Sequence, residues 1–405
     1  MRLVVVALAM ALCAGCSNRP VGVLTPVEAA VPGTTKVDLL VATTREASND
    51  VATLYTGERA AGVSLDAFTV SIPPDSRRQI GEVQWPRSLP PNPETDFATL
   101  AVKPLPDVKA AKGWLDGHLP KSRRVLIFVH GFNNRFEDAV YRFAQIVHDS
   151  GSEVAPVLFT WPSRARVFDY LFDRESTIVS RDAFEDTVWQ VASDPRVEDV
   201  TIMAHSMGAW LAMESLRQMA IRHGKLPAKI RNVILASPDV DVDVFASQWR
   251  ALQGTQARFT LFVSRDDRAL QVSRRIAGGV DRLGMIDTQH FYGELQKSGI
   301  VVIDLTAMRS GDSLNHGRFA SSPEVVQLIG QRLVNGQTVT DSDVSLGDRI
   351  AAGAMGVGQT VGSAAGLAIS APLAVIDPNT RRTYQGQVER FGRTVTETVE
   401  DPGAD

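Results

Sequence analysis

Cysteine is scarce in this chain. Of 405 residues only Cys13 and Cys16 are cysteines, and both lie within the first sixteen positions. The folded part therefore contains no disulfide framework, which excludes the class of small, disulfide-stabilised scaffolds. Stability must come from a hydrophobic core, and a chain of this length with 44% hydrophobic residues has ample material for one large core.

An excess of charge of either sign is also missing. The chain has 42 Lys and Arg against 46 Asp and Glu, a formal net charge of -4, and no block of like charge. Binding of nucleic acid depends on clustered cations that neutralise phosphates. The sequence therefore offers no basis for a nucleic-acid partner and leaves small or uncharged substrates open.

Signatures of metal and nucleotide chemistry are absent as well. Neither the seven histidines nor the two cysteines have the spacing of metal ligands. We find no phosphate-binding loop, no dinucleotide fingerprint and no internal repeat. We therefore expect no metal and no cofactor, so any chemistry has to come from protein side chains.

The N-terminal segment has the layout of an export signal. An apolar run from Leu3 to Leu12 leads into small residues that end at Cys16. The sequence Ala14-Gly15-Cys16 resembles a bacterial lipobox, which implies cleavage before Cys16 and acylation of this residue. Two acyl chains would anchor the protein stably to a membrane. Cys13 stands where lipoboxes prefer leucine, so an ordinary secretory signal is the alternative.

The residue after Cys16 bears on the destination. It is Ser17 and not aspartate. By resemblance to enterobacterial lipoproteins, this implies a location in the cell envelope, lipid-anchored to the outer membrane on its periplasmic side.

The centre of the chain alternates apolar, β-branched runs with amphipathic stretches, which is typical of strands and crossover helices. Strands that are apolar throughout are buried on both faces, and right-handed crossovers then favour a mostly parallel, doubly wound α/β sheet with flanking helices. The predicted strands are Arg124–Val129, Ala155–Trp161, Val200–Ala204, Asn232–Ala236, Phe259–Val263 and Ile300–Leu305. The predicted helices are Arg135–Asp149, Arg181–Ser193, Met207–His223, Val242–Leu252, Arg268–Gly278 and Pro323–Leu333.

The flanking segments have other patterns. Residues 37–120 contain strand-like runs and proline clusters, which predict two or three strands that extend the main sheet. Residues 1–15 are the expected signal, and residues 16–36 the lipid anchor and a tether without periodicity. The central domain covers residues 37–335. In the tail, 336–405, many glycines disfavour a helix, so we expect docking or disorder rather than membrane insertion.

The sharpest local motif is Ala204-His205-Ser206-Met207-Gly208, between a predicted buried strand and a predicted helix. On such a tight turn the serine is exposed at the carboxyl edge of the sheet, and small flanking residues allow the sharp bend. Ala204 stands where this motif usually has its first glycine, and alanine still meets the steric demand. The motif predicts Ser206 as a nucleophile.

An oxyanion needs two backbone donors, and the loop after an earlier strand usually supplies one of them. His130-Gly131-Phe132 follows such a strand, so the predicted donors are the amides of Phe132 and Met207. We interpret His130 as a brace of this loop and not as the base. Trp161, at the end of the neighbouring strand, lines the acyl pocket or serves packing alone. The expected pocket residues are His130, Gly131, Trp161 and His205.

The base and the acid follow from chain order, which in this fold is serine, acid, histidine. His316 lies in a loop after the last predicted strand and is the predicted base. Asp267 follows the strand Phe259–Val263 and is the predicted acid, which would orient the imidazole. Asp239, after the preceding strand, is the alternative acid. The histidines that chain order excludes are His118, His130, His148 and His205.

Taken together, these segments resemble an uncharacterised bacterial α/β-hydrolase family of esterase/lipase type over about residues 37–333. The resemblance rests on Val129-His130-Gly131-Phe132-Asn133-Asn134, Phe136-Glu137-Asp138-Ala139, Trp161-Pro162-Ser163, the serine motif and Ser237-Pro238-Asp239-Val240-Asp241. It implies the α/β-hydrolase fold and a serine hydrolase acting on small-molecule or lipid esters through Ser206, Asp267 and His316. Acyl transfer by the same residues and a non-catalytic binding lipoprotein are the alternatives.

The stretch between Asp239 and Ala257 is too short for a large cap domain. We therefore expect an open cleft that suits bulky esters, with a lid built from residues 164–180 as the alternative.

Overall fold

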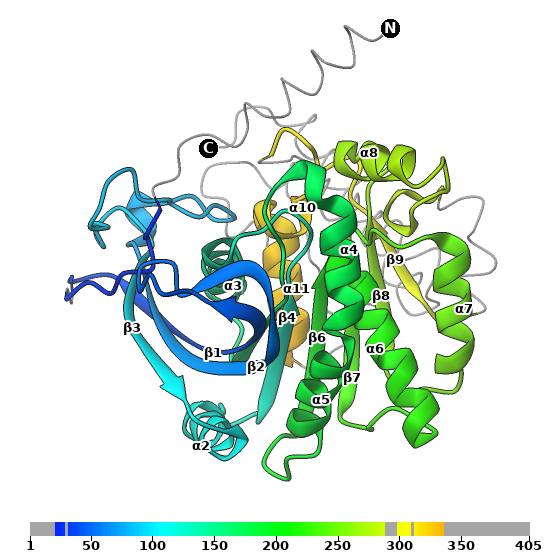
Figure 1. Cartoon of the computed structure of the whole chain (residues 1–405), viewed down its shortest axis with the longest axis horizontal. Coiled ribbons are helices and arrows are strands. Elements are labelled where there is room, and N and C mark those ends of the chain that lie inside the picture. The colour runs from blue at the N-terminus through cyan, green and yellow to red at the C-terminus, as the bar shows by residue number, and fades with distance from the viewer. Residues whose placement is uncertain (1–20, 29–30, 288–297, 309–311, 336–405) are drawn as a thin grey trace, which may run out of the picture.

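The structure, a computed structural model, describes residues 21–28, 31–287, 298–308 and 312–335. It contains a nine-stranded sheet in the order β3-β2-β1-β5-β4-β6-β7-β8-β9 (Figure 1). The pairs β1–β2 and β2–β3 are antiparallel, and all other pairs are parallel. The strands are β1 (Thr35–Ala47), β2 (Tyr55–Ile72), β3 (Ala98–Leu105), β4 (Arg124–Val129), β5 (Ala155–Thr160), β6 (Asp199–His205), β7 (Ile230–Ala236), β8 (Arg258–Val263) and β9 (Val301–Asp304).

Helices cover both faces of the sheet, so the prediction of a doubly wound, mostly parallel sheet is confirmed. One face carries α3 (Phe136–Ser150), α10 (Arg318–Ser321) and α11 (Pro323–Asn335). The other carries α2 (Val108–His118), α5 (Arg181–Ala192), α6 (Met207–His223) and α7 (Val242–Leu252). The remaining elements are α4 (Tyr170–Val179), α8 (Arg268–Ile276) and the 3-10 turns η1 (Asp75–Arg77), η2 (Val167–Asp169) and η3 (Leu283–Met285).

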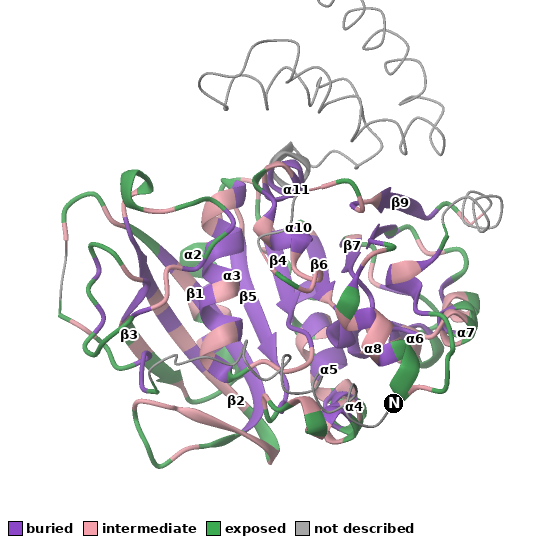
Figure 2. Cartoon of the chain, turned by 90° about the horizontal axis from the view of Figure 1, so that it is seen from above, coloured by how far each residue is buried: buried purple, intermediate pink, exposed green. Residues whose placement is uncertain are grey.

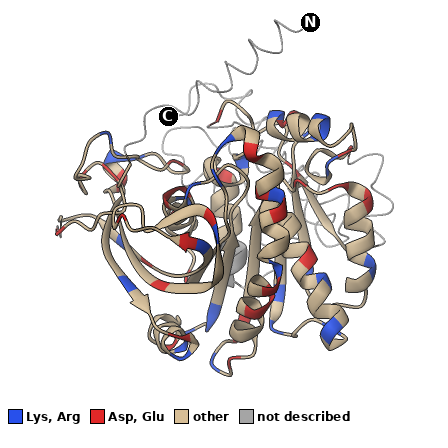
Figure 3. Ribbon diagram, viewed as in Figure 1, with Lys and Arg blue, Asp and Glu red and all other residues tan. Residues whose placement is uncertain are grey.

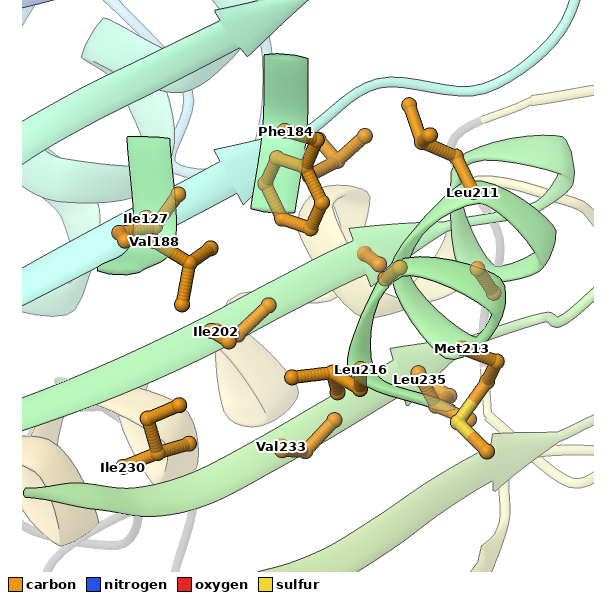
Figure 4. Close-up of a cluster of buried hydrophobic side chains, with 14 of the residues drawn as sticks. Ile127, Phe184, Val188, Ile202, Leu211, Met213, Leu216, Ile230, Val233 and Leu235 are labelled. Atoms are coloured by element: carbon orange, nitrogen blue, oxygen red, sulfur yellow. The ribbon is translucent and has the colours of Figure 1, made fainter. Parts of the chain in front are cut away.

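Two buried clusters, one on each face, form the core, and Figure 2 shows how burial follows the central strands. In Figure 4, side chains of α5 and α6 lie over β4, β6 and β7, with Val188 of α5 near Ile127 and Leu216 of α6 near Val233. The strands are apolar on both faces because both faces are covered. This is why their positions could be read from the sequence to within two residues.

The N-terminal extension contains the three strands β1–β3, but it also contains α2, which the sequence analysis missed. Gly113 and Gly117 weaken the helical pattern of this segment. Tertiary packing compensates, because Ala111 and Leu115 are buried against the sheet. The side chain of Asp107 caps the helix by accepting a hydrogen bond from the Ala110 amide at 2.8 Å.

Part of the segment predicted as a tether, residues 16–36, packs against the domain. Val23 and Leu24 are almost fully buried in the core. The Tyr141 hydroxyl donates to the Val23 carbonyl at 2.7 Å, and the Val27 amide donates to the Thr99 carbonyl at 2.9 Å. Two apolar side chains and two hydrogen bonds therefore hold this stretch against the domain. The expected signal and the expected tail lie outside the described residues.

The described surface mixes both signs of charge (Figure 3), as the composition suggests. Over the described parts of the chain, no helix combines the length and the apolar character needed to cross a bilayer.

Gly330 provides a test of the packing between α3 and α11. A Cβ atom at this position would collide with the Ser150 carbonyl. Alanine improves helix propensity by about 1 kcal/mol, but forcing α11 away from α3 costs more, up to about 3 kcal/mol. We expect Gly330→Ala to lower the free energy of unfolding, measured by urea denaturation. Gly113→Ala in α2 meets nothing within 4 Å and should instead raise it by about 1 kcal/mol. Equal effects of the two substitutions would contradict the tight contact.

Candidate active site

Ser206 lies on the turn between β6 and α6, in a conformation that serine rarely adopts. Its φ is 53° and its ψ is -120°, which costs on the order of 1–3 kcal/mol. The next strand holds the turn in place: the Ser206 amide donates to the Ala236 carbonyl at 2.9 Å, and the Asp239 amide donates to the Ser206 carbonyl at 3.1 Å. The backbone is therefore strained where the sequence predicts a nucleophile.

Two glycines let the turn approach the loop after β4. A Cβ at Gly208 would collide with the His130 carbonyl oxygen, and one at Gly131 would lie 2.8 Å from the Ser206 Cβ. Ala204 is fully buried, as its place in the motif requires. The structure thus brings the predicted nucleophile and the predicted oxyanion loop into direct contact.

The two predicted oxyanion donors border this contact. Neither the Phe132 amide nor the Met207 amide donates a hydrogen bond to another described residue. Phe132 lies in the loop after β4, and Met207 is the first residue of α6, which follows the neighbouring strand β6. They are therefore available to a ligand at this edge.

His130 is buried and fully occupied by structural contacts. Its Nε2 accepts from the Trp161 amide at 3.1 Å, so its Nδ1 donates to the Gly131 carbonyl at 2.8 Å. Trp161 in turn donates from Nε1 to the His130 carbonyl at 2.9 Å. Burial, with the charge of Arg45, lowers the pKa of His130 to about 3. A neutral ring with both nitrogens engaged braces the loop, as expected, and is not placed to act as a base.

Sequence reasoning missed Arg45, whose side chain connects several segments at this edge of the sheet by hydrogen bonds. Its side chain leaves β1 fully buried, and burial lowers its pKa to about 10 despite the nearby carboxylate of Asp173. It donates to the Thr160 hydroxyl at 2.9 Å and to the carbonyls of Asn134 at 2.9 Å and Ser163 at 3.1 Å. An arginine at the end of an otherwise apolar strand was the only signal in the sequence.

Asp173, which the sequence analysis also missed, lies in α4, and its negative charge compensates the charge of Arg45. It is fully buried and accepts hydrogen bonds from the Ser163 hydroxyl at 2.5 Å and from the Arg164 amide at 3.0 Å. Burial raises the pKa of its carboxyl. Arg45 and Asp173 together hold the loops after β4 and β5, so the predicted oxyanion loop is supported by a buried polar network.

His316 and Asp267 are hydrogen bonded. The His316 Nδ1 lies 2.7 Å from the Asp267 Oδ2, and the other oxygen of this buried carboxylate accepts from the Leu270 amide at 2.9 Å. Burial disfavours a charged ring, but the carboxylate of Asp267 outweighs it and raises the pKa of His316 above its ordinary value of 6.5. With Nδ1 donating to Asp267, the Nε2 of His316 is free to accept a proton.

Two other aspartates position the loop that carries His316. Asp312 accepts hydrogen bonds from the amides of His316 at 3.2 Å and Gly317 at 2.7 Å. Asp266 forms an ion pair with Arg318, which lowers the pKa of Asp266 to about 2. Asp266 therefore serves the loop, while its neighbour Asp267 contacts the imidazole.

Asp239, the alternative acid, has other partners. Its carboxylate accepts from the Tyr170 hydroxyl at 2.9 Å and the Ser273 hydroxyl at 2.5 Å, and it lies 3.3 Å from the Arg282 Nε. No described hydrogen bond joins it to His316. Between the two candidate acids, only Asp267 is in contact with the predicted base.

His205 links the serine turn to the histidine loop. Its ring centroid lies 4.7 Å from that of His316, and its Nε2 lies 3.3 Å from the His316 carbonyl. Burial and the neighbouring His316 hold the pKa of His205 well below its ordinary value. The Ser206 hydroxyl donates no hydrogen bond to a described residue. The structure thus brings Ser206 and His316 to one edge without a serine–histidine hydrogen bond.

Within the described residues no group of His, Cys, Asp and Glu side chains could hold a metal ion. A cavity of about 750 Å3 lies between β1, β2, α2 and α5, with Leu40, Leu65 and Val157 among its lining residues. None of the predicted site residues lines it.

The comparisons with known proteins agree with this architecture. A family model described as alpha/beta hydrolase of unknown function (DUF900) matches residues 107–332. The chain belongs to this family. The match covers every strand from β4 to β9 and all the predicted catalytic side chains.

Two solved structures are similar to this chain at low sequence identity. An esterase of Pyrobaculum calidifontis is 12% identical, with a TM-score of 0.32, over 67% of this chain and 81% of that one. A lipase-esterase related protein of Clostridium acetobutylicum is 13% identical, with a TM-score of 0.23, over 54% and 84%. No curated protein matches the sequence.

The His316–Asp267 contact predicts a titration that needs no substrate. In histidine-labelled protein, NMR should show His316 titrating above 6.5 and His130 remaining neutral far below it. Because the folded-state pKa of His316 is raised, the pair stabilises the fold fully below the unfolded pKa, and this contribution disappears as the pH rises through the folded pKa. Asp267→Asn should lower the pKa of His316 clearly more than Asp239→Asn does. The reverse order would make Asp239 its partner.

Proposed function

We propose that the protein is a serine hydrolase of carboxylic esters, with Ser206 as nucleophile, His316 as base and Asp267 as acid. The observation that carries the proposal is the 2.7 Å His316–Asp267 contact at the same sheet edge as the strained Ser206 turn. A strained serine beside an oriented imidazole and two unused amides is the set of groups that acyl transfer needs.

In the proposed first step the Ser206 Oγ attacks the ester carbonyl carbon, and the Nε2 of His316 takes the hydroxyl proton. The resulting tetrahedral oxyanion accepts hydrogen bonds from the Phe132 and Met207 amides, each worth about 3 kcal/mol in the transition state. His316 then gives its proton to the leaving alkoxide, and the alcohol departs. Asp267 stabilises the imidazolium in between without taking the proton.

The second half of the reaction repeats these roles with water. His316 removes a proton from water as the water oxygen attacks the acyl carbon, which forms a second tetrahedral intermediate. Its collapse breaks the bond to the Ser206 Oγ, His316 returns the proton to this oxygen, and the acid leaves. The hydrogen bond between Ser206 and His316 forms when substrate binds, since such catalytic hydrogen bonds often tighten only in the complex. The raised pKa of His316 means that activity rises with pH through that value, because only the neutral ring is a base.

We also propose that Cys16 is acylated and anchors the enzyme in the bacterial envelope. This rests on the apolar leader and the lipobox-like Ala14-Gly15-Cys16. The first described residues, 21–28, pack against the domain, so a short linker would join the lipid to the enzyme.

Ser206→Ala tests the nucleophile. A fluorophosphonate probe should label the wild-type protein and leave Ser206→Ala unlabelled, and hydrolysis of a 4-nitrophenyl ester should fall roughly ten-thousand-fold or more. Ser193→Ala, at an exposed serine after α5, is the control and should label normally. Labelling of Ser206→Ala at the wild-type level would place the nucleophile elsewhere.

Cys16→Ser tests the anchor. Metabolic labelling with a palmitate analogue should mark the wild-type protein and Cys13→Ser, but not Cys16→Ser, because acylation needs the thiol and the new amino terminus of Cys16. Equal labelling of both variants, or none of the wild type, would favour an ordinary secretory signal.

A further inference from the structure

The segment between β5 and α5 leaves two large apolar side chains in solvent. Phe168, in η2, is 86% exposed, and Leu171, in the first turn of α4, is 64% exposed. They stand on either side of Tyr170, which is buried. Single exposed apolar residues are ordinary, but a pair on one short turn beside a catalytic edge marks a contact surface.

Tyr170 fixes this pair at the rim of the proposed oxyanion loop. Its ring packs edge-on against Phe132, with centroids 5.2 Å apart. Its hydroxyl donates to Asp239 at 2.9 Å and lies 3.0 Å from the Ser273 hydroxyl. Since Tyr170 points inward and is held by these contacts, Phe168 and Leu171 are held pointing outward at the same rim.

Neighbouring aromatic rings are covered, and Phe168 is not. The guanidinium groups of Arg164 and Arg59 lie 3.7 Å and 4.4 Å from the centre of the Phe172 ring. Arg174 covers Trp210 at 4.6 Å. Among the described residues, Phe168 has no such cation and no ring partner. Its exposure is therefore not relieved within the described part of the fold.

Two arginines precede Phe168, and only one of them forms a salt bridge with a described residue. Arg164 is paired with Glu58 at 2.8 Å. Arg166, two residues before Phe168 and exposed, forms no salt bridge with a described residue, although its charge lowers the pKa of Glu58 together with Arg164. An exposed guanidinium beside two apolar side chains fits a lipid surface, where it meets phosphate oxygens while the apolar groups enter the acyl boundary.

We infer that Arg166, Phe168 and Leu171, here called the rim patch, dock the enzyme onto an anionic lipid surface. The patch is far smaller than the roughly 800 Å² per partner of a stable protein interface, whereas a lipid surface can take up single side chains. Resting on the proposed function, this assigns esters held in a membrane as the substrate class. The rim patch delivers such esters to Ser206.

The first test measures binding without catalysis. The full chain carrying Cys16→Ser, which cannot be acylated, is sedimented with vesicles of phosphatidylcholine and phosphatidylglycerol. Adding Phe168→Ser and Leu171→Ser should weaken binding roughly tenfold or more, because two apolar side chains no longer leave water. The matched control is Val51→Ser with Ile221→Ser, which removes two side chains that are 76% and 59% exposed elsewhere. It should bind as the parent does.

Arg166→Glu tests the electrostatic part. It should reduce binding to these vesicles roughly fivefold or more and leave binding to pure phosphatidylcholine nearly unchanged. Circular dichroism melts check that each variant is folded.

The second test measures the substrate class. The rate on 4-methylumbelliferyl oleate embedded in vesicles is divided by the rate on dissolved 4-methylumbelliferyl butyrate. This ratio should fall roughly tenfold in the Phe168→Ser, Leu171→Ser variant and stay constant in the control. If both vesicle binding and the rate ratio are unchanged in this variant, the inference is overturned, and the rim patch would then be a contact surface for a protein. Loss of vesicle binding in a protein that hydrolyses neither ester would sink the hydrolase proposal but keep the docking surface.

Discussion

The edge that carries the candidate active site depends on one backbone contact, between the turn after β6 and the loop after β4. Gly208 lies against the His130 carbonyl, and Gly131 lies against Ser206. A side chain at either position would push the two segments apart. The Ser206 amide is held by Ala236 in β7 and its carbonyl by Asp239 in the segment after β7, and these two hydrogen bonds oppose relaxation of the strained conformation.

Around this contact, charged groups are buried in matched sets. Arg45 and Asp173 support the loops after β4 and β5. Arg282 pairs with Asp239, and Asp239 accepts a hydrogen bond from Tyr170 at the start of α4. Removing one partner of such a set leaves a buried charge uncompensated, which is why these groups act as a unit. Each aspartate at this edge has a different partner, and Asp267 is the one that contacts the imidazole of His316.

The central sheet could be predicted because its strands are apolar on both faces and its helices amphipathic. Prediction failed where local pattern and packing disagree. The glycines of α2 weaken its helical signal, yet Ala111 and Leu115 are buried. Val23 and Leu24 sit in a stretch without periodicity, and only the presence of Tyr141 and β3 beside them explains their burial. The segment 164–180 showed no pattern that distinguished a lid from a helix, and it forms η2 and α4.

The sequence by itself determined the fold class, the serine turn and the glycines that permit it, and it predicted the chain order of the proposed nucleophile, acid and base. These are local properties, set by residue size, periodicity and backbone freedom over a few positions. Only the tertiary structure decided which aspartate contacts His316, that Arg45 supports the oxyanion loop, and that Phe168 and Leu171 face solvent at its rim. Those outcomes depend on side chains that meet although they lie far apart along the chain, 49 residues for Asp267 and His316 and 89 for Arg45 and Asn134. No local pattern in the sequence records such a meeting.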